Sequence, residues 1–316
     1  MIHIIDDSIL IFLNRITANP SDSPELFCNQ CKTISPLLPT DIKQILDQFS
    51  NKTHSFVLFR TSVPIPLTTE MITPENSNQH IGETTILAKI QGIILNYLGE
   101  MIAYEAEGNG YLFQDIVPVK SMATLQSSVG SNIELEIHTE QAFSNLRPDI
   151  LCLACLKTDE NAWTYFLTID TLLSQLTSDE IELLHQPLWY IGVDLSFKLH
   201  GNEFIEGDIR GPISILNADS SSLVFDQDLM RGITEEAQQM ILKIVDIYYK
   251  HRIAYCLEPG DILLLDNRYI VHGRSPFFPK YDGNDRFLVR AFAVYDYNYI
   301  KSEYARADRM VLAIYS

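Results

Sequence analysis

The stretch EPGDILLLDNRYIVHGRSPF (residues 258–277) indicates the fold class of this chain. A Pro-Gly-Asp turn precedes an apolar run, which ends in polar residues and a histidine. Similar short apolar or alternating runs recur from residue 110 onward, separated by turn-forming residues. They are YLFQDIVPV (111–119), IELEIHTE (133–140), DILCLACLK (149–157), WTYFLTI (163–169), PLWYIGVDL (187–195), PISILN (212–217), SSLVFDQDL (221–229) and RFLVRAFAVYD (286–296). Many short strands separated by turns are typical of an antiparallel sandwich or barrel.

Two stretches with helical spacing, residues 171–184 and 235–251, interrupt these runs. Their order is not the regular strand-helix alternation of a parallel sheet. We therefore expect a mainly β chain with flanking helices, folded as a double-stranded β-helix (jelly roll, cupin-like). A single domain would span residues 1–316, with its jelly-roll core at about 110–296, helical and loop additions at the N-terminus and a short C-terminal extension.

Four segments before this core also carry local signals. Helical spacing predicts helices over residues 40–49 and 84–103, and the apolar run at 55–61 predicts a strand. The polar, turn-rich segment 69–82 is expected to be a surface loop.

Composition excludes several classes of partner. Among 316 residues, 41 are acidic and 23 basic, which gives a formal charge of -18 that repels nucleic acid and anionic membranes. The N-terminal stretch lacks the basic region and cleavage site of a signal peptide, and no apolar run is long enough to cross a bilayer. We expect a soluble, cytoplasmic protein that acts on a small molecule.

Cysteine spacing raises the question of a zinc site. Four of the five cysteines form the CxxC pairs Cys28/Cys31 and Cys152/Cys155. The second pair lies in an apolar run with strand character, and residues three apart on a strand point to opposite faces. Buried core cysteines are therefore the favoured interpretation, and zinc is the alternative.

A different group of residues has the character of a metal site. His138 and Glu140 are two apart in an alternating run, so both side chains emerge from one face of a strand. His272, on a late strand, is the natural third ligand. Two imidazoles and one carboxylate leave three positions open on iron(II), as in non-haem oxygenases that bind a bidentate co-substrate and dioxygen. The alternative is that these histidines are ordinary core or surface residues.

Arg286 and Arg290 follow His272 and are four apart on a probable strand, so they share a face. A guanidinium fork suits the far carboxylate of a dicarboxylate co-substrate, and a buried arginine is costly without an anion. The alternative for either arginine is a structural salt bridge with a core acid.

The segments HTEQAFSNLRPD (138–149), EPGDILLLDNRYIVHGRSPF and DRFLVRAFAV (285–294) together resemble the clavaminate synthase-like branch of the TauD-related 2-oxoglutarate oxygenases. This branch includes hydroxylases of free arginine, asparagine and lysine, and the resemblance covers roughly residues 84–296. It implies a jelly roll in which His138, Glu140 and His272 are the catalytic iron(II) ligands. It also implies that Arg286, Thr164 and Arg290 hold 2-oxoglutarate, with O2 as the second co-substrate.

The resemblance further implies a substrate site. Ser128 and Arg290 match positions at the substrate or co-substrate, and Glu107 falls where relatives place a polar residue near the substrate amine. Asp226 and Asp228 fall in the region whose acids grip the substrate in the amino acid hydroxylases. Acids at both ends suit a cationic amino acid such as arginine or lysine, although a helix cap or a solvated loop would also explain an aspartate pair.

The expected activity is Fe(II)/2-oxoglutarate-dependent hydroxylation of an unactivated carbon of a free, preferably basic L-amino acid, with succinate and CO2 as co-products. The carboxylate Glu140 favours hydroxylation over halogenation, since related halogenases have a small residue in its place. Alternatives are an oxygenase or desaturase acting on a peptidyl or carrier-bound amino acid, and a non-catalytic jelly-roll binding protein.

Overall fold

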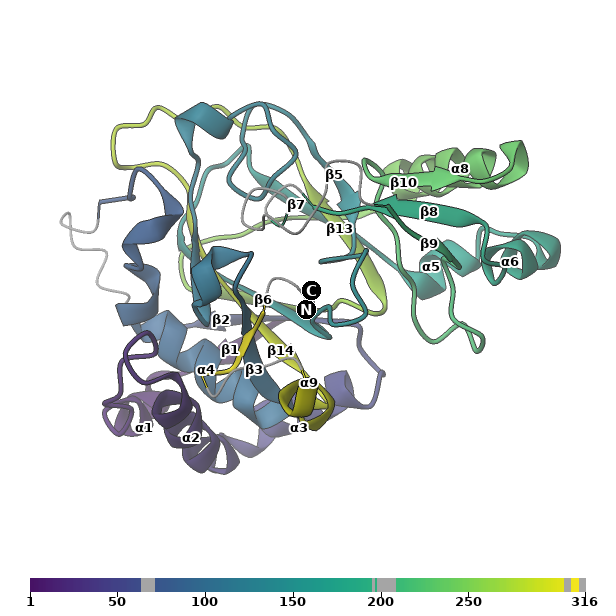
Figure 1. Cartoon of the computed structure of the whole chain (residues 1–316). Helices are drawn as coiled ribbons and strands as arrows, with labels where there is room; N and C mark the ends of the chain where they lie inside the picture. The colour runs from purple at the N-terminus through teal and green to yellow at the C-terminus, as the bar shows by residue number, and fades with distance from the viewer. Residues whose placement is uncertain (64–71, 195–196, 198–208, 304–307, 313–316) are drawn as a thin grey trace.

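The computed structural model describes residues 1–63, 72–194, 197, 209–303 and 308–312 (Figure 1). Its strands form a large sheet, a second sheet of four strands and a small sheet of three strands. The large sheet has the order β1 (Ile2–Ile5), β2 (Phe56–Thr61), β12 (Asp261–Asp266), β6 (Ile150–Lys157), β14 (Phe287–Val294), β3 (Glu100–Tyr104) and β15 (Met310–Val311), with β4 (Phe113–Ile116) also paired to β14. The second sheet has the order β11 (Ile253–Cys256), β7 (Trp163–Thr168), β13 (Ile270–Arg274) and β5 (Leu135–His138).

The small sheet and the helices surround this pair of sheets. The small sheet has the order β10 (Met230–Gly232), β8 (Trp189–Gly192) and β9 (Ile209–Ile213). The α-helices are α1 (Leu10–Leu13), α2 (Pro24–Ile34), α3 (Thr40–Ser50), α4 (Ile86–Leu98), α5 (Ile169–Leu173), α6 (Ser178–Leu184), α8 (Glu235–His251) and α9 (Tyr297–Glu303). Single 3₁₀ turns lie at Asp7–Ile9, Ser35–Leu37, Ser77–Gln79, Gly82–Thr84, Gly108–Gly110 and Lys120–Met122. No helix in these described ranges has the length and apolar character needed to cross a membrane.

The central strands β6, β12 and β14 of the large sheet are buried on both faces, which explains their nearly continuous apolar sequences. Along β6, Leu151 and Leu153 belong to the core between the sheets, whereas Ile150 and Cys152 belong to a second core on the other face. The N-terminal helices supply the rest of the second core, and Figure 1 shows α2, α3 and α4 gathered beside the large sheet. The sheets and helices thus form a double-stranded β-helix whose outer face is closed by the N-terminal segment.

Most of the elements expected from the sequence are confirmed. The helix predicted over 40–49 is α3, the helix over 235–251 is α8, and the strand over 55–61 is β2. The apolar runs from residue 111 onward give β4, β5, β6, β7, β8, β12, β13 and β14, although PISILN contributes only the end of β9. Leu195, the last residue of PLWYIGVDL, lies outside the described residues.

Three predicted elements are wrong in their extent or type: the helices over 171–184 and 84–103, and the strand over 221–229. The helix expected over 171–184 is divided into α5 and α6, because Thr177 and Glu180 form a capping box that begins a new helix. The run 221–229 is not a strand and makes only the single bridges Leu216↔Leu223 and His138↔Asp226. The expected loop 69–82 is confirmed where it is described. Residues 69–71 lie outside the described residues, and residues 72–81 contain no strand or α-helix, only the 3₁₀ turn Ser77–Gln79, although Thr73 is buried.

The helix predicted over 84–103 ends early, at Leu98. Gly99 follows it, and β3 then pairs with β14 through Phe292↔Ile102. A Cβ added at Gly99 would lie 2.4 Å from the backbone oxygen of Val294, so only glycine permits this approach between the chain and β14. Tertiary pairing therefore overrides the helical spacing of residues 100–103.

The cysteines lie where strand geometry places them. Cys152 packs in the core under the helices and Cys155 in the core between the sheets, so this pair points to opposite faces of β6. Cys28 and Cys31 are buried on α2. The prediction of buried core cysteines is confirmed for these four residues.

The close approach at Gly99 gives a prediction about stability. Gly99→Ala should lower the free energy of unfolding by about 2 kcal/mol, because the new methyl group must displace the backbone of β14. Urea denaturation measures this change. Gly192→Ala is the matched control, since an added Cβ there lies 3.5 Å from the nearest side-chain atom and should change stability by less than about 1 kcal/mol. Equal effects of the two substitutions would contradict the explanation.

Candidate metal centre and substrate cavity

Antiparallel pairing of β5 with β13 places the two predicted histidine ligands opposite each other. His138 and His272 are register partners, and the centroids of their rings are 4.5 Å apart. Glu140 follows two residues after His138, and its Oε1 lies 3.1 Å from His272 Nε2. One ligand atom from each of the three residues lies within 4.8 Å of the other two. Among the described residues, this is the group that could hold a metal ion.

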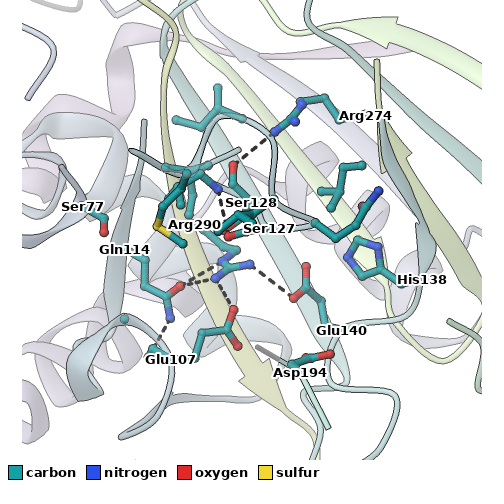
Figure 2. A pocket seen from close by; sticks show the side chains of 18 of the residues that line it. Ser77, Glu107, Gln114, Ser127, Ser128, His138, Glu140, Asp194, Arg274 and Arg290 are labelled. Carbon is teal, nitrogen blue, oxygen red and sulfur yellow. Dashed lines mark hydrogen bonds and ion pairs between the residues drawn. The ribbon is translucent and has the colours of Figure 1, made fainter. Parts of the chain in front are cut away.

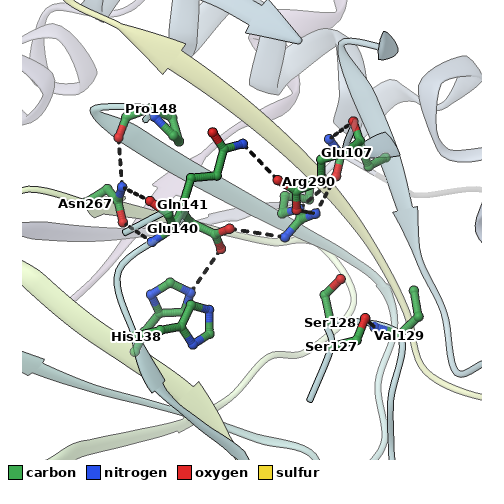
Figure 3. A network of polar contacts seen from close by, with 12 residues as sticks. Glu107, Ser127, Ser128, Val129, His138, Glu140, Gln141, Pro148, Asn267 and Arg290 are labelled. Carbon is green, nitrogen blue, oxygen red and sulfur yellow. Dashed lines mark hydrogen bonds and ion pairs between the residues drawn. The ribbon is translucent and has the colours of Figure 1, made fainter. Parts of the chain in front are cut away.

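Neighbouring groups fix the orientation of these ligands. His138 Nδ1 donates to the carbonyl of Glu136 at 2.8 Å, which leaves Nε2 with the lone pair that binds a metal. The amide side chain of Asn267 holds the backbone of Glu140 from both sides: its Oδ1 accepts from the Glu140 N–H at 2.7 Å, and its Nδ2 donates to the Glu140 carbonyl at 3.2 Å (Figure 3). Sequence reasoning did not single out Asn267, because nothing local distinguishes this polar turn residue.

The protonation of the group also suits a metal. Burial alone would raise the pKa of Glu140, but Arg290 and His272 outweigh it and hold that pKa well below its usual range. Burial, with help from His138, lowers the pKa of His272. A charged carboxylate and a neutral imidazole are the forms that coordinate metals. Two imidazoles and a carboxylate in this arrangement fit iron(II) with open positions.

A cavity of about 780 Å³ opens beside the three ligands (Figure 2). Every site residue predicted from the sequence lines it: His138, Glu140, His272, Arg286, Thr164, Arg290, Glu107, Ser128, Asp226 and Asp228. These residues come from β5, β7, β13, β14 and the loops beside them, so the tertiary structure brings the whole predicted set together. Their roles toward ligands remain predictions.

One part of the cavity wall carries two arginines without an acid. Arg286 is buried just before β14, and Arg274 is buried on β13 beside Thr164 of β7. Within the described part of the chain, neither arginine forms an ion pair. Burial lowers the pKa of Arg286, and burial together with Arg286 lowers the pKa of Arg274 to about 9. An uncompensated buried pair of guanidinium groups is suited to a carboxylate ligand.

Arg274 was not predicted from the sequence. It also donates to the carbonyl of Ser128 at 3.2 Å, and so holds the loop that carries Ser128 against the cavity. An arginine two residues after His272 on an alternating strand shares its face, and this spacing was the signal that could have identified it.

Arg290 has a different environment from Arg286. Its Nε donates to Gln114 Oε1 at 2.9 Å, its Nη1 to Glu140 Oε2 at 3.3 Å, and its Nη2 pairs with Glu107. The alternative of a salt bridge with a core acid is therefore what the structure shows for Arg290. The same contacts place its guanidinium beside both the candidate metal ligand and the cavity.

Carboxylates gather in another part of the cavity. Asp226 lies on the segment that pairs with β5, where its Oδ1 accepts from the Leu229 N–H at 2.7 Å, and Asp228 lines the cavity nearby. Asp194, just after β8, is a further lining residue that sequence reasoning missed. Burial, then the charges of Asp226 and Glu107, raise the pKa of Asp194 well above its usual value. No described residue donates a hydrogen bond to the Asp194 carboxylate.

Comparison with known proteins identifies the class. The model of the family "Taurine catabolism dioxygenase TauD, TfdA family" matches residues 213–292. The chain is 42% identical over 310 residues to an L-lysine 3-hydroxylase of Catenulispora acidiphila, covering 95% of this chain and 85% of that protein. It is 32% identical over 201 residues to an L-asparagine oxygenase of Streptomyces coelicolor, covering 63% of this chain and 59% of that protein.

Solved structures show the same fold. The structure of asparagine oxygenase with Fe(II), hydroxyasparagine and succinate superposes with a TM-score of 0.86 at 24% identity, covering 98% of this chain and 99% of that one. The iron oxygenase OrfP with Fe and alpha-ketoglutaric acid gives a TM-score of 0.84 at 21% identity, covering 98% of this chain and 100% of that one. The predicted double-stranded β-helix is confirmed.

The chain therefore belongs to the TauD/TfdA family of Fe(II)/2-oxoglutarate-dependent dioxygenases, and within it to the amino acid hydroxylases. The predicted family, enzyme class and cofactors are confirmed, which removes the non-catalytic binding protein as an alternative.

The geometry of the ligands predicts the outcome of removing one of them. His272→Ala should abolish stoichiometric binding of iron(II), because two remaining ligands hold the ion too weakly. Metal analysis after anaerobic loading measures the iron content. His251→Ala is the control, since His251 is exposed at the C-terminal end of α8 and does not line the cavity. Full iron content in the His272 variant would reject the assignment.

Proposed function

We propose that this enzyme hydroxylates free L-lysine. The observation that carries the proposal is the excess of acid in the cavity: Asp194, Asp226 and Asp228 line it, and no described residue forms an ion pair with any of them. Asp226 is buried, Asp194 is half-buried and Asp228 is exposed. A buried carboxylate is costly without a cation, so a substrate with a cationic side chain would compensate Asp226 and attract its two neighbours. The 42% identical relative is named for lysine, which supports an ammonium rather than a guanidinium at this position.

His138, Glu140 and His272 would hold iron(II), and Arg286 with Thr164 would hold the far carboxylate of 2-oxoglutarate. When bound, iron(II) with 2-oxoglutarate and O2 supplies the oxidising power for C–H hydroxylation, with succinate and CO2 as co-products. Arg274 adds a second positive charge beside Arg286 and fixes the adjacent loop through Ser128. The protein thus contributes binding, orientation and exclusion of water around the reacting carbon.

The other predicted residues would orient the amino acid. Arg290 and Ser128 are suited to its α-carboxylate, Glu107 to its α-ammonium, and the aspartates to its side chain. Arg290 lies 3.3 Å from the metal ligand Glu140, so a carboxylate bound to Arg290 is close to the metal. The carbons nearest the α-carbon would then approach the iron first. This proximity supports attack at C3, as in the reaction named for the lysine relative.

The proposal is tested by supplying the iron-loaded enzyme with 2-oxoglutarate and each of the free amino acids. The expected result is succinate formed with L-lysine, together with a lysine product heavier by one oxygen atom, detected by mass spectrometry. Nuclear magnetic resonance of the product locates the hydroxyl group. Turnover of a neutral amino acid in preference to lysine, arginine or ornithine would reject the role of the acidic wall.

Removing one carboxylate should change charge selectivity. Asp226→Asn or Asp194→Asn should lower kcat/KM for L-lysine about a hundredfold, because the buried ammonium loses its countercharge. The neutral analogue L-norleucine should change by less than about threefold. Asp219→Asn, in an exposed loop, is the matched control and should leave both values unchanged. An equal loss with lysine and norleucine would show that the aspartate serves only the fold.

A further inference from the structure

A glutamate of β5 lines the substrate cavity without a cationic partner. Glu136 is half-buried and lies two residues before the candidate ligand His138. Its backbone is already engaged, because its N–H donates to Gln126 Oε1 at 3.1 Å and its carbonyl accepts from His138 Nδ1 at 2.8 Å. Across the ranges that the structure describes, no side chain forms an ion pair or a hydrogen bond with its carboxylate. Glu136 thus presents a carboxylate that is available to a ligand of the cavity.

Strand pairing brings a second acid to the same part of the cavity wall. The bridge between His138 and Asp226 is antiparallel. The chain after Asp226 therefore runs toward the start of β5, and Asp228 lies on the Glu136 side of the bridge. Burial raises the pKa of Glu136 most, and the charges of Asp228 and Asp226 raise it further, as expected of neighbouring carboxylates. Like charges that face each other across paired strands are destabilising, so a cation between them would stabilise both.

The cations near Glu136 do not fill that place. Arg231 is exposed and has a weaker, opposing effect on the pKa of Glu136 than burial and the two aspartates, and its Nη1 donates to the carbonyl of Met230 at 2.6 Å. Glu134 lies outside the cavity, and its Oε1 pairs with Arg252 Nη1 at 2.9 Å. Of these two glutamates, the protein itself compensates only the one outside the cavity.

Glu136 lies at one end of the stretch that carries two of the candidate ligands. Glu140 is at the other end, where Arg290 Nη1 donates to its Oε2 at 3.3 Å. A strand advances about 3.3 Å per residue, so Glu136 is about 7 Å from His138 along β5, on the side away from Glu140. An amino acid with its α-carboxylate near Arg290 would therefore extend past the metal ligands before its side chain reached Glu136.

We propose that Glu136, together with Asp228, binds the side-chain ammonium of the substrate and selects L-lysine over the shorter L-ornithine. The inference rests on the proposed function and makes it more specific, since it adds Glu136 to the acids of the cavity and gives this residue a task of its own. A lysine ammonium between the two acids would replace their mutual repulsion with two charge-assisted contacts.

The length of the substrate decides which acid its ammonium meets. Ornithine is one methylene shorter, so with its α-carboxylate in the same place its ammonium stops nearer Asp226 and leaves Glu136 without a partner. L-Norleucine has the carbon chain of lysine but no side-chain charge. A carboxylate that only attracted cations from solution would favour lysine and ornithine alike. The comparison of these three amino acids therefore separates a direct contact from a long-range attraction.

The first experiment measures the wild type and Glu136→Gln with lysine, ornithine and norleucine. Glutamine keeps the size of the side chain and removes its charge. We expect kcat/KM for lysine to fall about thirtyfold, because a charge-assisted contact is lost, and the values for ornithine and norleucine to change by less than about threefold. Calorimetric titration of the iron- and 2-oxoglutarate-loaded enzyme without oxygen should show the same selective loss of lysine binding. Equal losses with lysine and ornithine would overturn the inference.

Glu136→Asp tests whether a positioned contact or charge alone is needed. Aspartate keeps the charge but withdraws the carboxylate from the cavity by one methylene. A positioned contact predicts that this variant still loses about tenfold in kcat/KM for lysine. Wild-type activity toward lysine in Glu136→Asp would show that only the charge matters, and the inference would be wrong.

Glu134→Gln is the matched control, because Glu134 is a glutamate directly before β5 whose carboxylate pairs with Arg252 outside the cavity. It should leave the ratio of lysine to ornithine turnover unchanged. Iron content should equal that of the wild type in every variant, since the carbonyl that holds His138 belongs to the backbone of Glu136. Loss of iron in Glu136→Gln would mean that the side chain acts through His138, which also overturns the inference.

The two proposals fail in distinguishable ways. If lysine is hydroxylated but Glu136→Gln affects all three amino acids equally, the function stands and the role of Glu136 is rejected. If the wild type prefers ornithine or a neutral amino acid, the proposed function is rejected, and the selection of lysine by Glu136 with it.

Discussion

The pairing of β5 with β13 is the interaction on which the rest of this site depends. It places His138 opposite His272 at neighbouring positions of one sheet. Glu140 completes the group beyond the end of β5, where the strand no longer fixes its side chain. The amide of Asn267, from the turn between β12 and β13, takes over that task by holding the Glu140 backbone. β13 and the turn before it, which carry His272 and Asn267, therefore position all three candidate ligands.

Charge is distributed unevenly around these ligands. Arg274 and Arg286 line one part of the cavity, whereas Asp194, Asp226 and Asp228 line another. Figure 2 shows Arg274 and Ser128 toward the top of the view and Glu107 and Asp194 toward the bottom. Within the described residues, neither the two arginines nor the three aspartates have an ion-pair partner. Arg290, which lines the same cavity, pairs with Glu107 and Glu140. Under the proposed function, the charges of the buried Arg274, Arg286 and Asp226 are compensated when the co-substrate and the substrate bind, so the empty enzyme is less stable than the liganded one.

The terminal segments contribute more to the structure than their sequences indicate. β1 pairs with β2 at one edge of the large sheet, and β15 pairs with β3 at the other. Between them, α2, α3 and α4 bury the outer face of β6, β12 and β14. Arg309, beside β15, is ion-paired with Glu25 and Glu100, which connects the C-terminal strand to α2 and β3. These contacts hold both edges and the outer face of the sheet that carries Arg290.

The sequence by itself predicted the strands β2, β4 to β8 and β12 to β14, the candidate ligands and the family, because strand alternation, ligand spacing and motifs are local properties. It also placed Cys152 and Cys155 on opposite faces for the same reason. The run 221–229 was wrongly predicted as a strand, and β3 was expected to be the end of a helix. Gly99 is a local stop signal for α4, but the change to strand at Glu100 was decided by pairing with β14, which is distant in the chain. Tertiary structure likewise revealed Asn267 and Asp194, whose importance comes from neighbours distant in the chain. The partners of Arg290 were also decided by tertiary structure. Residue spacing predicted the face of β14 on which Arg290 lies, but only the folded chain shows that Glu107 and Glu140 form ion pairs with its guanidinium.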